Sequence, residues 1–355
     1  MQDLLGMELP ALARVVADLG ERPFRARQIY RWLYSRRAVS IQTMTDLSAG
    51  LRRHLEDRFV LRWPRVAQIQ ISEDGTRKFL LSPASGGQVE SVFIPERDRV
   101  TFCISPQIGC ALDCSFCLTA RLGFVRNLSA GEIVGQVLVL LEETRREWRD
   151  RPVNIVMMGM GEALHNYDNA IAAVRILADP EGAGIPARRI TLSTAGMVPG
   201  IGRLAAEPIR PKLAVSLNAA TDEVRSRVMP INRKYPLEVL LDACGRYPLA
   251  PRERLTFEYV LLRGINDSRT DPGRLASLLN RHRLKAKVNL IPFNPTPELP
   301  YEEPAAETVR RFRDELLARG VAVSIRKNRG RDISAACGQL ALVSAASATG
   351  PEPPP

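Results

Sequence analysis

Histidine is scarce in this sequence, and long apolar stretches are missing from it. Only three histidines occur in 355 residues, at His54, His165 and His282. No apolar run approaches the roughly 20 residues that a membrane-spanning helix needs, and the first residues lack the basic start of a secretory signal. We therefore expect a cytoplasmic protein without a membrane span, whose cysteines are kept as thiols.

Acidic residues are outnumbered by basic ones. The chain has 50 lysines and arginines against 39 aspartates and glutamates, a formal net charge of +11. A chain this basic often binds polyanions such as nucleic acids, although a solvated basic surface explains the same excess. The hydrophobic share of 45% and the charged share of 25% are ordinary for a soluble globular protein, and the length suggests roughly two domains.

Residues 1–62 are predicted to form a helical accessory domain. Within it, residues 24–37 place Ile29 and Leu33 one turn apart on an apolar face. The same region mixes arginines with aromatic residues, which suits phosphate contact with some stacking on bases; for the aromatic residues, packing in the core is the preferred interpretation. The residues of this mixture are Arg22, Arg25, Arg27, Arg31, Arg36 and Arg37, with Phe24, Tyr30, Trp32 and Tyr34.

Residues 63–99 change to short β-rich runs. An Asp-Gly pair at Asp74 and Gly75 separates the first two runs, which predicts a β-hairpin. We expect a small antiparallel β unit that leads into the core of the protein, with strands near 66–72, 77–82 and 88–94.

Strand-like and helix-like segments alternate from residue 100 to residue 343. A capping box at Ser129 and Glu132 opens a helix predicted to extend to residue 148, and Gly320 is expected to end another. Such alternation indicates a parallel sheet, and six or seven units predict a barrel or partial barrel with functional groups after the strands. Residues 344–355 are predicted to be a disordered tail. The predicted strands are 101–105, 154–160, 188–194, 212–218, 255–262, 287–293 and 321–327.

Three of the six cysteines lie within eight positions. Cys110, Cys114 and Cys117 have the spacing C-x₃-C-x₂-C and follow the first predicted barrel strand. A structural zinc site needs four ligands, and no histidine is near in sequence. Three thiolates suit a [4Fe–4S] cluster with one iron left open for a small molecule. Buried structural cysteines are the alternative.

This spacing resembles the radical S-adenosylmethionine (SAM) superfamily. The resemblance implies a cluster that binds SAM, passes it one electron and releases a 5′-deoxyadenosyl radical. After the second predicted strand, Gly159 and Gly161 would let the backbone approach a ligand closely, and Glu162 is placed to accept its ammonium group. Small polar residues also end later strands, where ordinary turn chemistry is the alternative. These segments are STAG (193–196), SLNAA (216–220) and PFNP (292–295).

The chain further resembles one family of this superfamily, the bacterial dual-specificity ribosomal and transfer RNA adenine-C2 methyltransferases. The resemblance covers residues 20–345. At Asn218 the family more often has histidine, but asparagine keeps a donor and an acceptor. The motifs, in family order, are FRARQIYRWLY, MTDLS, VESVFIPE, QIGCALDCSFC, GFVRNLSAGEIVGQV, MGMGE, PIN, LIPFNP and RGRDISAACGQLA.

The resemblance implies an α/β fold, namely a partial (β/α)6 radical-SAM barrel with an N-terminal helical domain and a small antiparallel β extension. The implied activity is methylation of adenine C2 in 23S rRNA, at the peptidyl-transferase centre, and in tRNA next to the anticodon. C2 is electron-poor and will not attack the methyl group of SAM, so the cofactor must supply a carbon radical.

Roles for single residues follow from the same resemblance. Cys337 is methylated by a first SAM and, after hydrogen abstraction, adds its methylene to C2. Glu90 accepts the C2 proton, and Cys103 attacks the Cys337 sulfur to release the product. Without the family, Cys103 is most simply a buried hydrophobe and Glu90 an exposed strand residue, while Cys244 is assigned to packing. The implied SAM contacts are Gly161, Glu162, Ser193, Ser216, Leu217, Asn218 and Asn294, and two SAM are used per turnover.

The expected partners are 23S rRNA and tRNA, an electron donor such as flavodoxin or ferredoxin, and a reductant for the transient Cys103–Cys337 disulfide. The basic stretch 325–332 is the stronger candidate for RNA contact near Cys337. Nothing in the sequence requires more than a monomer. The alternatives are methylation of adenine C8, as in resistance-related relatives, a non-catalytic iron–sulfur RNA-binding protein, and a radical-SAM activase. The cysteines do not separate C2 from C8.

Overall fold

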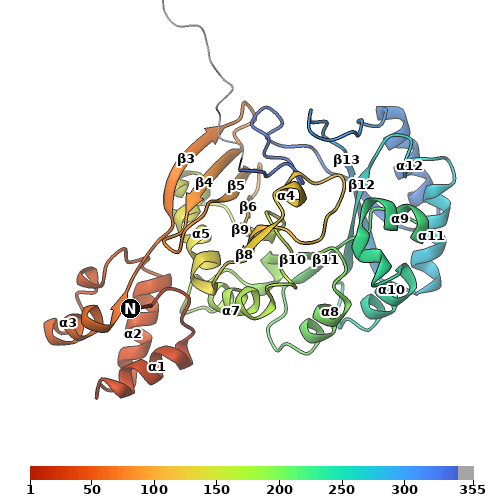
Figure 1. Ribbon diagram of the computed structural model, residues 1–355. Coiled ribbons are helices and arrows are strands. Elements are labelled where there is room, and N and C mark those ends of the chain that lie inside the picture. Colours follow the sequence, from red (N-terminus) through yellow and green to blue (C-terminus); the bar gives the residue numbers. More distant parts are fainter. Residues whose placement is uncertain (343–355) are drawn as a thin grey trace, which may run out of the picture.

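The computed structural model describes residues 1–342, so the tail predicted for 344–355 lies outside the described residues. Its centre is a ten-stranded sheet in the order β14-β13-β12-β11-β10-β9-β6-β5-β4-β3 (Figure 1). The seven strands from β6 through β9 to β14 run parallel, as predicted. These strands are β6 Val100–Cys103, β9 Val153–Met157, β10 Ile190–Thr194, β11 Lys212–Ser216, β12 Leu255–Leu261, β13 Ala286–Pro292 and β14 Ala322–Ile325.

Helices connect the parallel strands, which gives the alternation of a partial barrel (Figure 1). The capping box is present, with Glu132 N donating to Ser129 Oγ and Ser129 N to Glu132 Oε2. The helix it opens ends at Glu143, before the predicted residue 148, because Thr144 leaves the helical conformation. The connecting helices are α5 Ala130–Glu143, α6 Arg145–Trp148, α7 Tyr167–Ala178, α8 Val198–Ala205, α9 Asp222–Val228, α10 Leu237–Gly245, α11 Asp271–Arg281 and α12 Ala306–Ala318, with 3-10 turns η2 Ala187–Arg189 and η3 Pro230–Arg233.

The antiparallel strands β3 Arg65–Ile71, β4 Arg77–Ser82 and β5 Val89–Pro95 extend the same sheet. The hairpin predicted at the Asp-Gly pair is confirmed, and Gly75 there has a φ of +81°. Because β5 pairs with β6, the extension continues the barrel sheet without a break. Two further short pieces follow β6: the hairpin of β7 Gln107–Gly109 and β8 Phe124–Asn127, and helix α4 Leu118–Arg121.

The N-terminal helices lie beside the barrel (Figure 1). Gly6 and Gly131 bring the chain's start against the first turn of α5, since a Cβ on Gly6 would lie 2.3 Å from Gly131 N. As preferred from the sequence, Tyr30 and Tyr34 are buried, but Phe24 is 48% exposed, so the preference for core packing is wrong at that residue. The elements here are β1 Gln2–Asp3, α1 Leu9–Asp18, α2 Phe24–Tyr34, η1 Ile41–Thr43, α3 Ala49–Arg58 and β2 Phe59–Val60.

Several arginines of this region are engaged by acidic side chains of the chain itself. Arg31 Nη2 lies 2.6 Å from Glu181 Oε1, and Arg37 pairs with Glu142 of α5. These ion pairs join the N-terminal helices to the barrel, so part of the predicted RNA-contacting mixture has a structural role. No helix among the described residues is both long and apolar enough to cross a membrane.

Candidate active site

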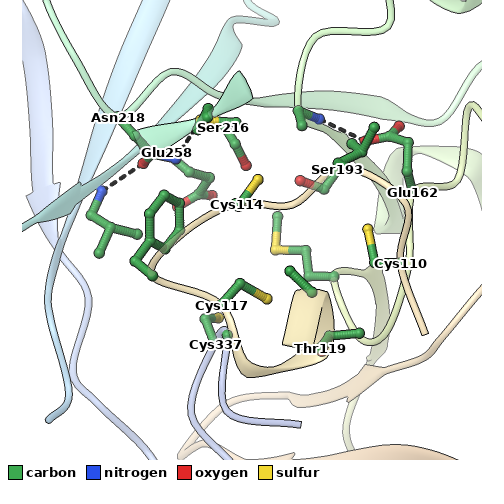
Figure 2. A pocket seen from close by; sticks show the side chains of 18 of the residues that line it. Cys110, Cys114, Cys117, Thr119, Glu162, Ser193, Ser216, Asn218, Glu258 and Cys337 are labelled. Atoms are coloured by element: carbon green, nitrogen blue, oxygen red, sulfur yellow. Dashed lines mark hydrogen bonds between the residues drawn. The ribbon is translucent and has the colours of Figure 1, made fainter. Parts of the chain in front are cut away.

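The three clustered cysteines lie on the loop between β7 and α4 and line one pocket, here called the cofactor pocket (Figure 2). At the start of the loop, Cys110 N donates to Gly123 O at 2.9 Å. Gly109 permits this approach, because a Cβ there would lie 1.8 Å from the same oxygen. At the end of the loop, Leu118 N donates to Gly338 O at 2.7 Å. The loop is thereby tied to the segment that carries Cys337.

The donor set fits a cubane cluster. Burial raises the pKa of Cys110 to about 11 and also raises the pKa of Cys114 and Cys117, so the free thiols are neutral and a metal must displace their protons. The three sulfur donors come from one loop, and Cys337 reaches the same pocket from a different segment. This arrangement suits a [4Fe–4S] cluster held by three thiolates, with one iron free for SAM.

Glu162 forms the wall beside the end of β10. Its Oε1 accepts from Leu164 N at 3.1 Å and its Oε2 from Ala195 N at 2.7 Å. The side chain is buried, and burial raises the pKa of Glu162 to about 7. These hydrogen bonds fix the carboxylate in place, and a cation beside it would stabilise its charged form. Both properties suit the predicted contact with the SAM ammonium group.

The two glycines before Glu162 also allow close packing within the protein, while their predicted approach to a ligand stays a prediction. A Cβ on Gly159 would lie 2.4 Å from Ser105 Oγ, and one on Gly161 would lie 2.4 Å from Gln107 Cβ. Gly161 also has a φ of +93°. Both glycines line the cofactor pocket, but the close approach that demands them is to the strand end that leads into the cysteine loop.

The remaining predicted SAM contacts divide into two groups. Ser193, Ser216 and Asn218 line the cofactor pocket. Asn218 has a φ of +59°, its Oδ1 accepts from Val260 N at 2.8 Å and its Nδ2 donates to Met229 Sδ at 3.1 Å, so its amide already holds the neighbouring strand. Leu217 and Asn294 do not line the pocket. Asn294 Oδ1 instead accepts from Arg331 Nε at 2.6 Å, and a SAM contact for these two stays a prediction.

Cys337 stands where several cavities meet. It is exposed and lines the cofactor pocket, and it shares a small cavity with Cys103 of β6. Cys103 is buried, and burial, with a smaller contribution from Cys337, raises the pKa of Cys103 to about 12. The sequence separates these two thiols by more than two hundred residues, and the fold brings both to one cavity.

Glu90 is buried outside these cavities and holds the C-terminal segment. Its Oε1 lies 3.1 Å from Lys78 Nζ, and its Oε2 accepts from Ala341 N at 2.9 Å and from Leu342 N at 3.3 Å. The expectation of an exposed strand residue is therefore wrong. The carboxylate lies on β5, whose residue Val92 pairs with Cys103.

A second cavity, here called the basic cavity, opens along the inner face of the barrel. It shares Met158, Glu258, Ile291, Arg326 and Cys337 with the cofactor pocket. Its cationic side chains far outnumber its two glutamates, Glu96 and Glu258, so it favours a polyanion. The cationic residues are Arg99, Arg188, Arg189, Lys212, Lys287, Arg326, Lys327 and Arg329.

Sequence reasoning missed several residues of the site. Glu258 lies between Phe257 and Tyr259, and Lys78 is followed by Phe79 and two leucines; both charges are buried, and a charge beside such an apolar run was the available signal. Arg225 is fully buried and donates to Leu217 O at 3.0 Å and Ala195 O at 2.7 Å, which ties together the ends of β10 and β11. As an arginine on a short helix it carries no signal.

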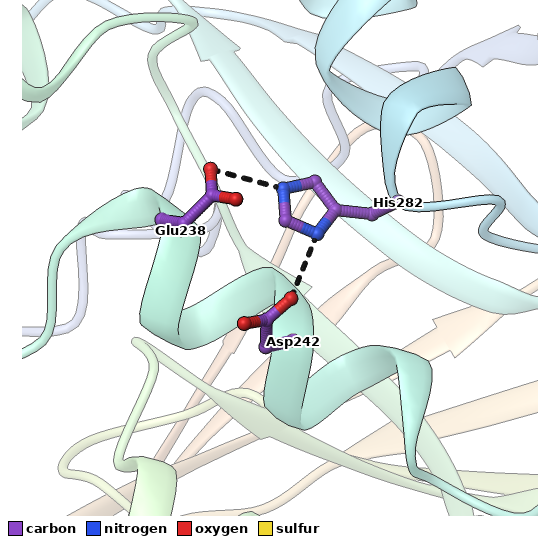
Figure 3. Close-up of side chains that lie close together, drawn as sticks. All are labelled: Glu238, Asp242 and His282. Carbon is purple, nitrogen blue, oxygen red and sulfur yellow. Dashed lines mark hydrogen bonds and ion pairs between the residues drawn. The ribbon is translucent and has the colours of Figure 1, made fainter.

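One cluster of potential metal ligands lies away from the site, on the surface of α10 and α11. His282 Nδ1 lies 3.1 Å from Asp242 Oδ1, and His282 Nε2 lies 3.3 Å from Glu238 Oε2 (Figure 3). Because each ring nitrogen faces a different carboxylate, the geometry is that of a bridging ion pair rather than a shared metal.

Known proteins resemble this chain in sequence. Residues 2–61 match the family model described as the ribosomal RNA large subunit methyltransferase N-terminal domain, and residues 104–271 match the radical SAM superfamily. A dual-specificity RNA methyltransferase RlmN from Geobacter sulfurreducens is 49% identical over 96% of this chain and 92% of its own length. One from Rhizorhabdus wittichii is 48% identical over 95% of this chain and 86% of its own length.

A solved structure agrees in fold. The crystal structure of a radical SAM methyltransferase from Sphaerobacter thermophilus superposes with a TM-score of 0.90 at 45% identity, covering 96% of this chain and 99% of that one.

Proposed function

Because the chain belongs to the dual-specificity RNA methyltransferase RlmN family, we propose that it is a radical SAM enzyme that methylates C2 of adenine in 23S rRNA and in tRNA. The observation that carries this proposal is the position of Cys337. It lines both the cofactor pocket and the basic cavity, so a methyl group on its sulfur faces the cofactor on one side and an RNA base on the other.

The cofactor pocket holds the cluster and SAM. Cys110, Cys114 and Cys117, which line this pocket, would bind three irons of the cluster, and Glu162 with Ser193 and Ser216 would orient SAM. When bound there, the cluster and SAM supply the electron and the carbon radical that remove a hydrogen atom from the methyl group of Cys337, after another SAM has donated that methyl group. The protein contributes position and the exclusion of water.

Cys337 carries the one-carbon unit to the base. Its methylene radical bonds to C2, which links the RNA covalently to the Cys337 sulfur. Glu90, whose carboxylate accepts from Ala341 N in the segment that follows Cys337, removes the C2 proton. The unpaired electron of the adduct would return to the oxidised cluster, which leaves a closed-shell thioether between Cys337 and C2. Cys103, which shares a cavity with Cys337, then attacks that sulfur. The bond between sulfur and carbon breaks with its electron pair on the carbon, which takes a proton from water to become the methyl group. The methylated adenine leaves, and a disulfide between the two cysteines remains.

The disulfide must be reduced before the next turnover, so we place the enzyme in the reducing cytoplasm, with a thiol reductant and an electron donor such as flavodoxin or ferredoxin. The basic cavity receives the RNA backbone around the target, since its cations compensate phosphate charge. The target base has to leave its stack to reach Cys337.

The test uses anaerobically reconstituted protein with SAM, a reductant and an adenine-containing ribosomal RNA fragment or a tRNA. Nucleoside mass spectrometry should find C2-methyladenosine with the unaltered enzyme and none with Cys337→Ala. With Cys103→Ala, RNA should accumulate in a covalent complex with the protein. Methylation at C8 alone would contradict the proposed product, and SAM cleavage with unmodified RNA would contradict the proposed substrate.

A further inference from the structure

Glu258 has a buried carboxylate oxygen that forms an ion pair with Arg326 but accepts no hydrogen bond from the described residues. The residue is 5% exposed on β12. Its Oε1 accepts from Asn289 Nδ2 at 2.9 Å, but its Oε2 accepts no hydrogen bond from the described residues. Leaving a charged acceptor unsatisfied costs free energy that a ligand's donor recovers. Since Glu258 lines the cofactor pocket (Figure 2), the oxygen has a ligand within reach.

Arg326 supplies donors beside this acceptor. Its Nη1 lies 3.7 Å from Glu258 Oε2, too far for a hydrogen bond, and 3.6 Å from Met158 Sδ. Arg326 and Glu258 are both among the residues shared by the cofactor pocket and the basic cavity, and Cys337 is a third. An acceptor, a donor and the carbon-carrying sulfur therefore border the same junction.

Adenine presents the matching edge. Its exocyclic amine at C6 donates, the adjacent ring nitrogen N1 accepts, and C2 follows N1 along the ring. Guanine carries an acceptor where adenine has the amine and a donor at N1, so it would meet both protein groups with the wrong polarity. We propose that Glu258 and Arg326 select the target base, with Glu258 accepting from the adenine amine and Arg326 donating to N1, which directs C2 to Cys337. This inference rests on the proposed function and adds a site for base selection.

The adenine of SAM carries the same amine, and the experiment must separate the two sources. Two RNA hairpins are compared that differ only at the target, one with adenosine and one with purine riboside, which lacks the amine. Their affinities for reconstituted enzyme are measured by fluorescence anisotropy without reductant, so that no turnover occurs, and the affinity for SAM is measured separately. Glu258→Gln is the variant, and Glu238→Gln, the same change on the exposed face of α10, is its control.

The unaltered enzyme and Glu238→Gln should bind the adenosine hairpin at least tenfold more tightly, as expected for a hydrogen bond to a charged acceptor. In Glu258→Gln the amide oxygen stays with Asn289 and its NH₂ replaces Oε2, so the preference should disappear while SAM affinity is kept. Equal binding of both hairpins by the unaltered enzyme would overturn the inference, and this comparison needs no variant to fold. Weaker SAM binding with an unchanged hairpin preference would also overturn it, because the carboxylate would then serve the cofactor.

Failure of the proposed function would look different. Under turnover conditions, no methylated adenosine would form on the adenosine hairpin, whatever the binding ratio. With a sound function and a wrong assignment of Glu258, the unaltered enzyme would methylate the adenosine hairpin, although the hairpin comparison or the SAM measurement had overturned the inference.

Discussion

The two cavities that meet at Cys337 are assembled in opposite ways. The cofactor pocket is made from short consecutive segments, such as the cysteine loop and the turn from Gly159 to Glu162, and it holds sulfur, glycine and small polar groups. The basic cavity combines the stretch with Arg326, Lys327 and Arg329 with side chains from several separate strands, for example Lys212 on β11 and Lys287 on β13. The difference indicates that the cofactor motifs are local in sequence, whereas much of the charge proposed to contact RNA, apart from the stretch 325–332, is brought together only by folding.

The basic cavity is also electrostatically strained in the absence of a ligand. Burial lowers the pKa of Lys287, and the nearby cations Lys212 and Arg326 lower it further, while Glu258 opposes this. Because its cations repel one another, binding of a phosphate in this cavity would be electrostatically favourable. The cofactor pocket differs in the sign of charge that it favours. Burial raises the pKa of Cys114 and of Glu162 there, so a bound cation would favour their deprotonated forms.

The largest effects are expected from replacing the thiols near the meeting point of the two cavities, because those thiols have different proposed roles. Cys114→Ala and Cys337→Ala should both reduce RNA methylation below detection, but for different reasons. Cys114→Ala loses a cluster ligand, so iron and sulfide content should fall. Cys337→Ala keeps all three ligands, so iron content should be unchanged. Cys244→Ala, a buried cysteine of α10, is the control and should keep both properties. Loss of iron in Cys337→Ala would place that thiol on the cluster side.

The second-largest effect is expected from breaking the buried ion pair of Lys78 and Glu90, whose carboxylate also binds the C-terminal segment at Ala341. Lys78→Met leaves the Glu90 carboxylate buried without its cation and should lower the free energy of unfolding by about 3–5 kcal/mol. Urea unfolding of the metal-free protein measures this. Arg77→Met, next in sequence, breaks a more exposed pair with Glu147 and should cost about 1 kcal/mol or less.

A double variant sharpens this measurement. Lys78→Met with Glu90→Leu removes both buried charges and should be more stable than Lys78→Met alone. If the two variants unfold at the same urea concentration, the unpaired charge of Glu90 is not what destabilises Lys78→Met.

The contrast between the cavities also explains what could be predicted from the sequence. The parallel strands, the capping box at Ser129 and the cysteine loop all depend on neighbouring residues, and the structure confirms them. The shortened helix after Ser129 and the ion pairs of the N-terminal arginines depend on contacts between distant segments. Those were not predictable from spacing.

The residues of the site also differ in whether neighbouring residues or distant contacts determine their roles. The cluster ligands and Glu162 come from motifs, whereas Glu258 and Arg225 owe their roles to a buried environment that only the fold creates. Glu90 illustrates both cases. The family motif identified it, but its partners Lys78 and Ala341 come from an adjacent strand and from the far end of the chain.

A smaller effect is expected from single charges of the basic cavity. Lys212→Met should weaken RNA binding by about fivefold and reduce by about one the slope of log affinity against log salt, if the ammonium contacts one phosphate. SAM binding should not change, because Lys212 does not line the cofactor pocket. Arg263→Met, an exposed residue paired with Glu302, is the control. An unchanged salt slope in Lys212→Met would mean that RNA does not reach this part of the cavity.

The smallest effect concerns the charge of the cofactor pocket itself. Burial raises the pKa of Glu162 from 4.5 to about 7, so between these values the folded metal-free protein binds more protons at this site than the unfolded chain. Its stability should therefore fall as the pH rises through this window. Glu162→Gln removes that contribution, so the gap between the two melting temperatures should shift in favour of the variant from pH 4.5 to pH 7.5. Parallel curves would contradict the raised pKa. Because a ligand ammonium beside the carboxylate favours its charged form, adding SAM to the reconstituted enzyme should reduce the pH dependence, which would identify Glu162 as the group that recognises the cofactor's charge.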